Sequence, residues 1–523
     1  MSITSAMYAG ISGLQTTSQG MSVVSNNLSN TDTVGFKGSK TTFEDTFYQA
    51  VNSSQGVSQV GTGVSLSAIY GDWSQGSYES STDATDLAID GDGFFMVRNG
   101  ETGDKYYTRA GDFRFNSDGY LVNASGYRVQ GWAVDSDTGD ITSSIGDIAI
   151  DDFQSPPSPT TSLSMYYNLD SSSDDESTNA TNPFFAMFEN WDGAADTALG
   201  DGLYAYSSTI TVYDENGSAH TLTVYFDPVD SDSTTGGSSS VTTWEYMVTC
   251  DASEDGRTID GQSVGTTSAA GILMIGTLSF SSSGELSSMT AYTLGSGASG
   301  DLKDLSNWTL ADFSDNGFAT FTANFTGASN ASYTGAAEAV SIELDLGLGS
   351  ADKSWSAGSA SNASVIGSNA SLLGSLSSPD PSNTTTTSYN ASSSTLSQSQ
   401  DGYASGFLQS ISVDSDGTIT ASYSNGQIVD LYKITIANFT NPDGLEREGS
   451  NLYSATRDSG EAVTGVAGTG SLGEVAANCL EQSNVDMATA LVRLITLQRM
   501  YDASSTIIST GDTMLQTVIA LKR

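Results

Sequence analysis

The stretch SNVDMATALVRLITLQRMYDASSTIISTGDTMLQTVIALKR, Ser483 to Arg523, decides the fold. Its apolar residues recur at heptad steps, which predicts one long helix. The first row is Met487, Leu491, Leu494, Tyr501, Ile508, Leu515 and Ile519. A second row, rotated by roughly 100° because each residue turns a helix by that amount, is Leu497, Met500, Ile507, Met514, Val518 and Leu521. A helix with two apolar rows is expected to contact more than one neighbour.

The other end of the chain offers the first neighbour. The same spacing is kept by Met7, Ile11, Leu14, Met21 and Leu28. Three glycines, Gly10, Gly13 and Gly20, lie inside this segment. Each costs about 1 kcal/mol against alanine, so the helix is expected to need a partner. Ser483 with Asp486 predicts the start of the C-terminal helix.

Two interpretations of these ends stay open. A two-helix stalk would close a monomer by joining its termini, whereas docking of the second row against other copies would make the ends a polymerisation device. Charge favours polymerisation. Residues 1–33 carry only Asp32, and residues 482–523 carry three acidic and four basic residues, so the two ends together are neutral. Neutral ends can crowd together while the acidic middle of the chain stays in water.

Composition limits the remaining choices. The 523 residues are enough for about three or four domains, and 55 glycines with many serines and threonines indicate short strands and turns. A net charge of −44 argues against nucleic acid and anionic membranes as partners. No segment predicts a membrane span or a Sec signal, and Cys250 and Cys479 are too few for a disulfide framework. We therefore expect a mainly β protein with helical ends, exported by a route other than Sec.

Residues 26–37 read NNLSNTDTVGFK, which is typical of a helix stop followed by an extended strand. The stretch resembles the N-terminal signature of bacterial flagellar rod and hook proteins. The matching residues are Asn27, Leu28, Asn30, Thr33, Gly35, Phe36 and Lys37. A second similarity to that family begins at Asp86, where DLAIDGDGFF is followed by YTRAGDF from Tyr107. A third, the family's C-terminal hallmark, includes Ser483, Asn484, Val485 and Asp486.

The middle of the chain is expected to form short strands and hairpins. Turn signals follow one another from Asn99 to Gly126, which predicts a β-meander, and Asn216-Gly217 and Asp416-Gly417 predict further hairpins. Residues 38–85 read as irregular, and residues 350–400 as loops or a poorly ordered part of an outer domain. The resulting domains are 1–33 plus 482–523, a terminal helical domain; 34–150 plus 401–481, a β core; and 151–400, an outer acidic insertion of one or two domains.

The sequence offers little chemistry. Its single histidine, His220, lies in a predicted strand and is interpreted as an ordinary strand residue. The two Gly-x-Gly-x-x-Gly matches, at residues 295–300 and 468–473, do not open a helix inside a βαβ unit and are interpreted as loops. Acidic clusters near Asp135 and Asp174 lack calcium-loop spacing. We expect no enzyme activity, no cofactor and no metal.

The resemblance implies a hook protein whose copies form a curved, flexible tube that joins the rod to the filament and transmits torque. It implies that the two heptad series line the tube as the assembly seam. It also implies partners: other copies of the chain, the distal rod protein, the hook cap protein, the hook–filament junction protein and the flagellar type III export apparatus. A distal rod protein is one alternative. The other is an acidic calcium-dependent surface adhesin, which would not account for the heptad ends.

Overall fold

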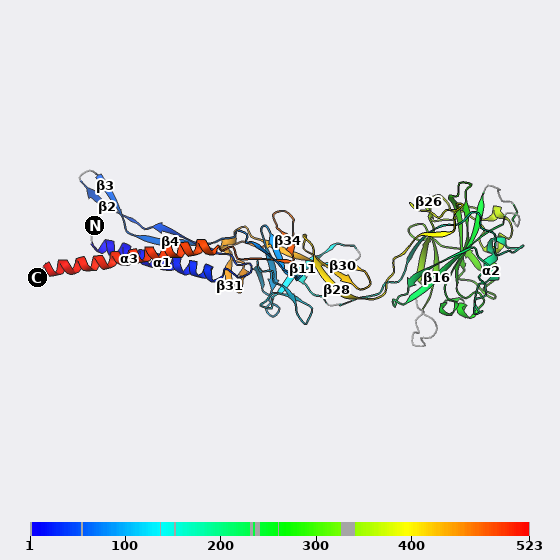
Figure 1. The fold of residues 1–523 in the computed structure, drawn as a ribbon, viewed down its shortest axis with the longest axis horizontal. Coiled ribbons are helices and arrows are strands. Elements are labelled where there is room, and N and C mark those ends of the chain that lie inside the picture. Colours follow the sequence, from blue (N-terminus) through cyan, green and yellow to red (C-terminus); the bar gives the residue numbers. More distant parts are fainter. Residues whose placement is uncertain are drawn as a thin grey trace. The chain divides into compact units, whose positions relative to one another are not determined.

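The computed structural model describes residues 3–53, 56–135, 138–150, 153–230, 234–235, 241–259, 261–325 and 340–521. They form two compact units (Figure 1): unit 1, residues 1–154 with 407–523, and unit 2, residues 155–406. The limits of unit 2 lie close to those predicted for the acidic insertion. Both the predicted helical domain and the predicted β core fall within unit 1, and the finer division between them stays a prediction. Within the described ranges, no helix is long and apolar enough to cross a membrane.

Unit 1 contains the two terminal helices, α1 (Ile3–Ser29) and α3 (Met487–Leu521). Both helices were predicted, and the residue that caps α3 differs from the expected one. The carboxylate of Asp486 accepts a hydrogen bond from the Thr489 backbone N–H at 2.6 Å. Ser483 instead accepts a bond from the N–H of Val485, before the helix begins. Asp486 is therefore the N-cap, because its carboxylate binds an N–H that the helix leaves unpaired.

Residues 38–85 are not irregular, as composition predicted, but contain five strands of unit 1. Strand β1 (Ser39–Asp45) pairs with β4 (Val64–Gly71), and β2 (Tyr48–Ser53) pairs with β3 (Gly56–Gly61), both antiparallel. β5 (Tyr78–Ser80) pairs with β35 (Cys479–Glu481) from the other end of the chain. These strands are rich in serine and threonine, so they lack the clear alternation of apolar and polar residues by which a strand is recognised in a sequence. β1 and β4 form the hairpin that lies beside α1, and they are called the helix-side hairpin below.

The large sheet of unit 1 mixes strands from both halves of the chain, in the order β28-β29-β30-β11-β7-β8-β32-β31. Their bounds are β7 (Phe94–Arg98), β8 (Lys105–Thr108), β11 (Arg128–Val134), β28 (Gly406–Val413), β29 (Thr418–Tyr423), β30 (Ile428–Asn438), β31 (Glu446–Gly449) and β32 (Leu452–Ser454). Joined to this path are β9 (Arg114–Phe115), β10 (Leu121–Val122), β12 (Ile141–Asp147), β33 (Val463–Val466) and, at the sequence boundary, β13 (Gln154–Ser155). β6 (Leu87–Asp90) pairs separately with β34 (Glu474–Ala477). The predicted meander and the Asp416-Gly417 hairpin are confirmed.

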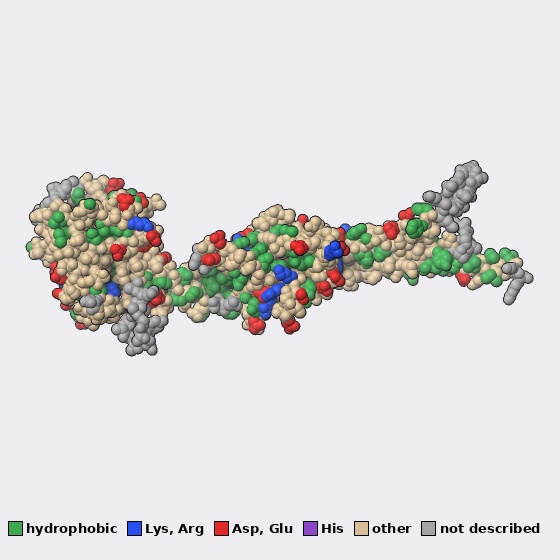
Figure 2. Space-filling view, turned by 180° about the vertical axis from the view of Figure 1, so that it is seen from behind, with side chains coloured by type: hydrophobic (Ala, Val, Ile, Leu, Met, Phe, Trp, Pro, Cys, Tyr) green, Lys and Arg blue, Asp and Glu red, His purple; other side chains and the backbone are tan. Residues whose placement is uncertain are grey.

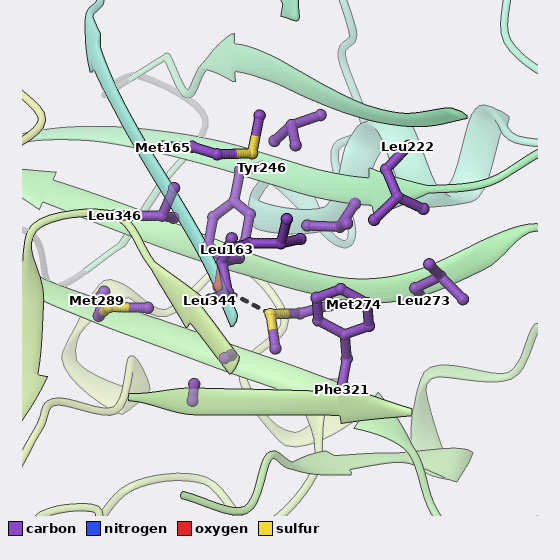
Figure 3. Close-up of a cluster of buried hydrophobic side chains, with 14 of the residues drawn as sticks. Leu163, Met165, Leu222, Tyr246, Leu273, Met274, Met289, Phe321, Leu344 and Leu346 are labelled. Carbon is purple, nitrogen blue, oxygen red and sulfur yellow. Dashed lines mark hydrogen bonds between the residues drawn. The ribbon is translucent and has the colours of Figure 1, made fainter. Parts of the chain in front are cut away.

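Unit 2 packs a six-stranded sheet, β15-β16-β17-β20-β21-β22, with a four-stranded sheet, β23-β24-β14-β27. The first sheet comprises β15 (Tyr206–Tyr213), β16 (Ala219–Pro228), β17 (Thr242–Thr249), β20 (Ile272–Phe280), β21 (Leu286–Leu294) and β22 (Trp308–Leu310). The second comprises β14 (Ser162–Asn168), β23 (Ala319–Ala323), β24 (Val340–Asp345) and β27 (Ser394–Gln400). Figure 3 shows Leu163, Tyr246 and Phe321, from both sheets, pointing into one core.

Shorter elements complete unit 2. The single-turn η1 (Pro183–Phe185) and α2 (Ala186–Asn190) bury aromatic side chains against the outer face of the six-stranded sheet. Two small ladders are β18 (Thr258–Ile259) with β19 (Gln262–Ser263), and β25 (Leu348–Ser350) with β26 (Pro379–Pro381). The hairpin at Asn216-Gly217 is confirmed, since β15 and β16 pair across it. The prediction for residues 350–400 was partly wrong, because β27 lies there and pairs with β14.

Candidate assembly surface

The helices α1 and α3 lie side by side and antiparallel in unit 1 (Figure 1). A β-carbon built on Gly511 would meet Met7 at 2.9 Å, one on Gly10 would meet Ile508 at 3.0 Å, and one on Gly20 would meet Leu497 at 3.4 Å. As the residue number rises along α1, it falls along α3. The two ends of the chain are therefore neighbours, as the heptad rows predicted.

Small residues set how closely the pair packs. Gly10 and Gly20 are buried, and Gly13 faces Ser504, whose Oγ would lie 2.8 Å from an added β-carbon. Sequence reasoning treated these glycines only as a cost to the helix. Their second effect is that, without β-carbons, the two backbones approach closely, as small residues allow between packed helices. The heptad pattern hid this because glycine does not count as an apolar position.

The predicted seam residues do not all lie between the two helices. In α1, Met7, Leu14, Met21 and Leu28 are half-buried and Ile11 is exposed. In the first row of α3, the half-buried residues are Leu494, Ile508 and Leu515, and the exposed ones are Met487, Leu491, Tyr501 and Ile519. The side of α3 that faces α1 therefore takes residues from both rows, since Leu497 of the second row is buried. The role of these residues in assembly stays a prediction.

The rest of the second row is exposed. Met500 is 48% exposed, and Ile507, Met514, Val518 and Leu521 are exposed as well, although Ile507 also reaches α1, where it lies 3.5 Å from a β-carbon built on Gly10. We call these five residues the outer strip. Figure 2 shows hydrophobic side chains on the surface of the helical part of unit 1. In a single chain the outer strip is exposed to water. A contiguous apolar patch that is exposed in this way marks an interaction surface.

The helix-side hairpin touches the pair at two levels. The Phe43 ring lies over Gly20, 3.1 Å from an added β-carbon, and Val64 donates its N–H to Ser12 Oγ at 3.3 Å. Arg493 of α3 also donates to the Thr41 carbonyl at 3.0 Å. Phe47 and Tyr48, near the turn of the hairpin, are exposed. Phe43 is thus the aromatic residue by which the helix-side hairpin packs on α1.

The family motif residues form the junction between the helices and the β strands. Asn27 donates to the Ser39 carbonyl at 2.7 Å and accepts from the Ser39 N–H at 2.9 Å. Asn484 does the same from the other end of the chain, since it donates to the Asp72 carbonyl at 2.7 Å and accepts from the Gly38 N–H at 2.9 Å. Each amide thereby pairs backbone groups that lie at the start of β1 or just after β4.

Other motif residues support the same junction. Asn30 accepts a hydrogen bond from the Thr33 hydroxyl at 3.2 Å. The side chain of Val485 lies 3.1 Å from a β-carbon built on Gly38, and the Phe36 ring is buried below the guanidinium of Arg447. Through these contacts, the N-terminal signature and the C-terminal hallmark lie next to each other in the fold.

Gly35 occupies a position that no other residue fits. Its φ is +67°, and a β-carbon there would lie 2.4 Å from the backbone nitrogen of Ala110. A left-handed conformation and a backbone this close both require glycine. Its N–H donates to the Glu481 carbonyl at 2.7 Å, so the turn after α1 is fixed to the strand that precedes α3.

A buried ion cluster lies next to this turn. Lys37 Nζ lies 2.6 Å from Glu481 Oε1, and Arg109 lies 3.4 Å from Glu481 Oε2. Burial lowers the pKa of Lys37, and the charge of Glu481 and its hydrogen bond to Lys37 act in the opposite direction. The Gly76 N–H also donates to Glu481 Oε1 at 2.8 Å. Lys37 and Arg109 belong to separate motifs of the sequence, and neither motif predicts that they meet Glu481.

The polar residues considered for chemistry lie elsewhere. His220 is on β16 between Glu254 and Asp214, at 3.0 and 3.4 Å, and stacks on Phe325. The two glycine-rich matches lie in loops, after β21 and after β33. Asp137 of the acidic cluster near Asp135 is outside the described residues. Among the side chains that the structure describes, no three His, Cys, Asp or Glu residues are arranged to hold a metal ion.

The two cysteines are unlike in their surroundings. Cys250 is buried in the core of unit 2, and burial raises the pKa of its thiol to about 12. Cys479 is half-buried on β35, and burial raises its thiol pKa as well. Both thiols are therefore protonated near neutral pH, which is the inert form.

Comparison with known proteins covers nearly all of the chain. The family "Flagella basal body rod protein" matches residues 7–37, "Flagellar hook protein FlgE/F/G D1 domain" residues 88–164, "Flagellar basal body protein FlaE D2 domain" residues 179–403, and "Flagellar basal body rod FlgEFG protein C-terminal" residues 476–521.

Individual proteins are similar over their full length. The flagellar hook protein FlgE of Treponema pallidum is 30% identical, with 99% of each chain covered, and that of Escherichia coli is 28% identical, with 99% of this chain and all of the other covered. A solved structure, the Helicobacter pylori hook protein FlgE2, covers 77% of this chain and 99% of its own at 16% identity and a TM-score of 0.42.

Proposed function

Because the chain belongs to the flagellar hook protein family and is a structural subunit of the bacterial flagellar hook, we propose that it polymerises through α1 and α3 into a curved tube. The tube joins the rod to the filament and transmits the torque of the motor. The observation that carries the assembly part of this proposal is the outer strip of α3, five apolar residues left in water by a single chain. The family implies self-polymerisation, and the strip is the surface best suited to it.

Charge supports the same surface. The helical ends are neutral as a pair, whereas unit 2 carries 29 acidic residues and three basic ones. Like charges resist close approach, most strongly at low salt. Copies of the chain therefore meet most easily through their helices, and unit 2 is better suited to the solvent side.

Neighbouring assemblies and export complete the proposal. Residues 7–37 match the family "Flagella basal body rod protein", which supports the distal rod protein as the partner at one end. The hook cap protein, the hook–filament junction protein and the flagellar type III export apparatus are proposed from the family alone. The relatives that are similar to this chain over its whole length are hook proteins, which favours the hook over the distal rod.

A pair of matched variants tests the assembly surface. Met500→Asp places a charge in the outer strip, whereas Gln498→Asp places the same charge two residues away, about 200° around the helix. Burying an unpaired carboxylate costs several kcal/mol, so Met500→Asp is expected to abolish tubes in electron micrographs of concentrated protein. Gln498→Asp is expected to retain them. Tubes of normal length from Met500→Asp would overturn the role of the strip.

A further inference from the structure

The helix α3 extends beyond α1. Met7 lies level with Gly511 and Gly10 with Ile508, so the first described residue of α1, Ile3, lies level with about residue 515. α3 continues to Leu521. Beyond that level, no described residue of α1 lies beside it. We call residues 514–521 the α3 tail.

The tail carries an apolar face. Met514, Val518 and Leu521 follow one another at the i, i+4, i+7 spacing that places side chains on one side of a helix. Val518 is 54% exposed and Leu521 is 83% exposed. Residues 513–521 contain no charged side chain. Beyond residue 515 the tail is therefore an apolar helix end that extends past the described residues of α1.

A groove of about 780 Å³ lies between α1 and the helix-side hairpin. It exists because the hairpin touches α1 near Ser12 and near Gly20 and stands away between these points. Its apolar lining comes from Leu14 of α1, Val64 and Leu66 of β4, and Tyr501 of α3, with Gln15 and Gln19 among its polar lining. None of its lining residues in the described ranges is charged.

The tail cannot fill the groove of its own chain. Tyr501 lines the groove, and Val518 lies 17 residues further along the same helix, which is roughly 25 Å at 1.5 Å per residue. A helix does not fold back on itself over that distance. Only another copy can bring a tail to this groove.

We propose that the α3 tail of one copy occupies the groove of the next copy. This inference rests on the proposed function, since it names the contact by which copies would join. The apolar face of the tail meets Leu14, Val64 and Leu66. Opposite charges also favour the contact. The sequence that follows the tail is basic, Lys522-Arg523, and Glu44 accepts a hydrogen bond at 3.2 Å from the hydroxyl of Ser65, a residue that lines the groove.

The contact joins two different surfaces. Each copy offers one tail and one groove, so a copy that has received a tail still offers its own. Such heterologous contacts extend without limit unless the rotation between copies closes a ring. Copies joined in this way would be staggered along the helix axis by roughly 25 Å, the distance from Tyr501 to Val518.

Disulfide trapping tests the contact directly. In a Cys479→Ser background, Val518→Cys is combined with Ser65→Cys, and the matched control combines Ser509→Cys with Ser65→Cys. Oxidation of polymers is expected to give a ladder of covalent oligomers for the first pair and none for the control. Dilute monomer of the first pair is expected to remain monomeric. An equal ladder from the control, or no ladder from the first pair in polymers, would overturn the docking.

A second measurement separates this inference from the proposed function. Val518→Asp is expected to raise the critical concentration for polymerisation at least tenfold, and Gln516→Asp, on the opposite side of the helix, is expected to leave it within twofold. A Val518→Asp chain that polymerises at the unaltered concentration would overturn the docking, whereas Met500→Asp, which lies outside the tail, tests the proposed function separately. Failure of the unaltered chain to polymerise would overturn the proposed function as well.

Discussion

The core of unit 2 and the helical pair of unit 1 differ in how far their apolar side chains are buried. In unit 2, Trp244, Trp308 and Phe226 are completely buried, and the carboxylates lie mostly in water. In the helical pair, Met500 and Val518 are half exposed, and the charges balance. Unit 2 buries its large apolar side chains within one chain, whereas the helical pair leaves apolar side chains in water. The difference supports the proposal that copies assemble through the ends of the chain.

The largest effect on stability is expected from unit 2. Trp244→Ala removes a fully buried indole and is expected to cost about 3 to 5 kcal/mol of the unfolding free energy of unit 2. Met500→Ala removes a side chain that water already reaches, so the monomer should lose no more than about 0.5 kcal/mol. Denaturant unfolding of the monomer measures both. Equal losses would mean that the strip is packed within one chain and would break the comparison.

A second pair of variants sharpens the comparison inside α3. Leu494→Asp places a carboxylate on the side that faces α1, and Leu491→Asp places one on a residue that is already exposed. Both residues belong to the predicted helical seam, so both variants are expected to block polymerisation while the β strands stay folded. The structure adds that Leu494→Asp should also speed amide exchange in α1 and α3 of the monomer, by roughly tenfold or more, because an unpaired charge disfavours the packed pair. Slow exchange in both helices of Leu494→Asp would contradict this.

The smallest effect is expected from pH and belongs to unit 2. Asp227 is fully buried, and burial raises its pKa to about 7. Asp175 and Glu245, also with raised pKa values, are the charged groups beside it. Ser177 donates its backbone N–H to Asp227 and its hydroxyl to Glu245. The basic residues of unit 2 bond elsewhere: Arg257 to Asp255, Lys353 to Asp315 and Lys303 to backbone carbonyls.

The sign follows from which state holds the proton. Between about pH 4, where an unfolded aspartate ionises, and pH 7, the folded state keeps a proton that the unfolded state has lost. The unfolding free energy of unit 2 is therefore expected to fall over this window, on the order of 1 to 3 kcal/mol, and to level off above it. Asp227→Asn should flatten the slope. The same slope in both proteins would show that other groups cause it.

Much of the fold was predictable where one local signal was strong. The heptad rows predicted α1 and α3. Asn216-Gly217 predicted its hairpin because tight two-residue hairpin turns require positive φ angles, which asparagine and glycine adopt readily. The strands β1 and β4 were missed, since Thr41, Thr42 and Ser65 give no clear apolar alternation. β27 was missed for the same reason. Its place depends on pairing with β14, some 230 residues away in sequence.

The sequence indicated which residues belong to the candidate site, but it did not predict how these residues contact one another. The motif residues Asn27, Gly35 and Asn484 were singled out, yet a single sequence cannot show that two amides clamp the same junction. Lys37 and Glu481 are separated by 444 positions and meet only because both ends return to one place. The outer strip was predicted as the second row, whereas the groove depends on where the hairpin stands away from α1, which no local pattern encodes.

The cluster of Lys37, Arg109 and Glu481 has a consequence for the order in which the chain folds. A chain delivered from its N-terminus presents Lys37 and Arg109 long before Glu481, and β7 before its partner β30. Unit 2, whose residues are contiguous, can close in the meantime. Unit 1 must wait for the last fifth of the sequence, and contacts of such long range form slowly. If copies join through their helical ends, as proposed, the joining surface is thus the last part of the chain to fold, and a chain that is still being delivered has no complete surface with which to join its neighbours.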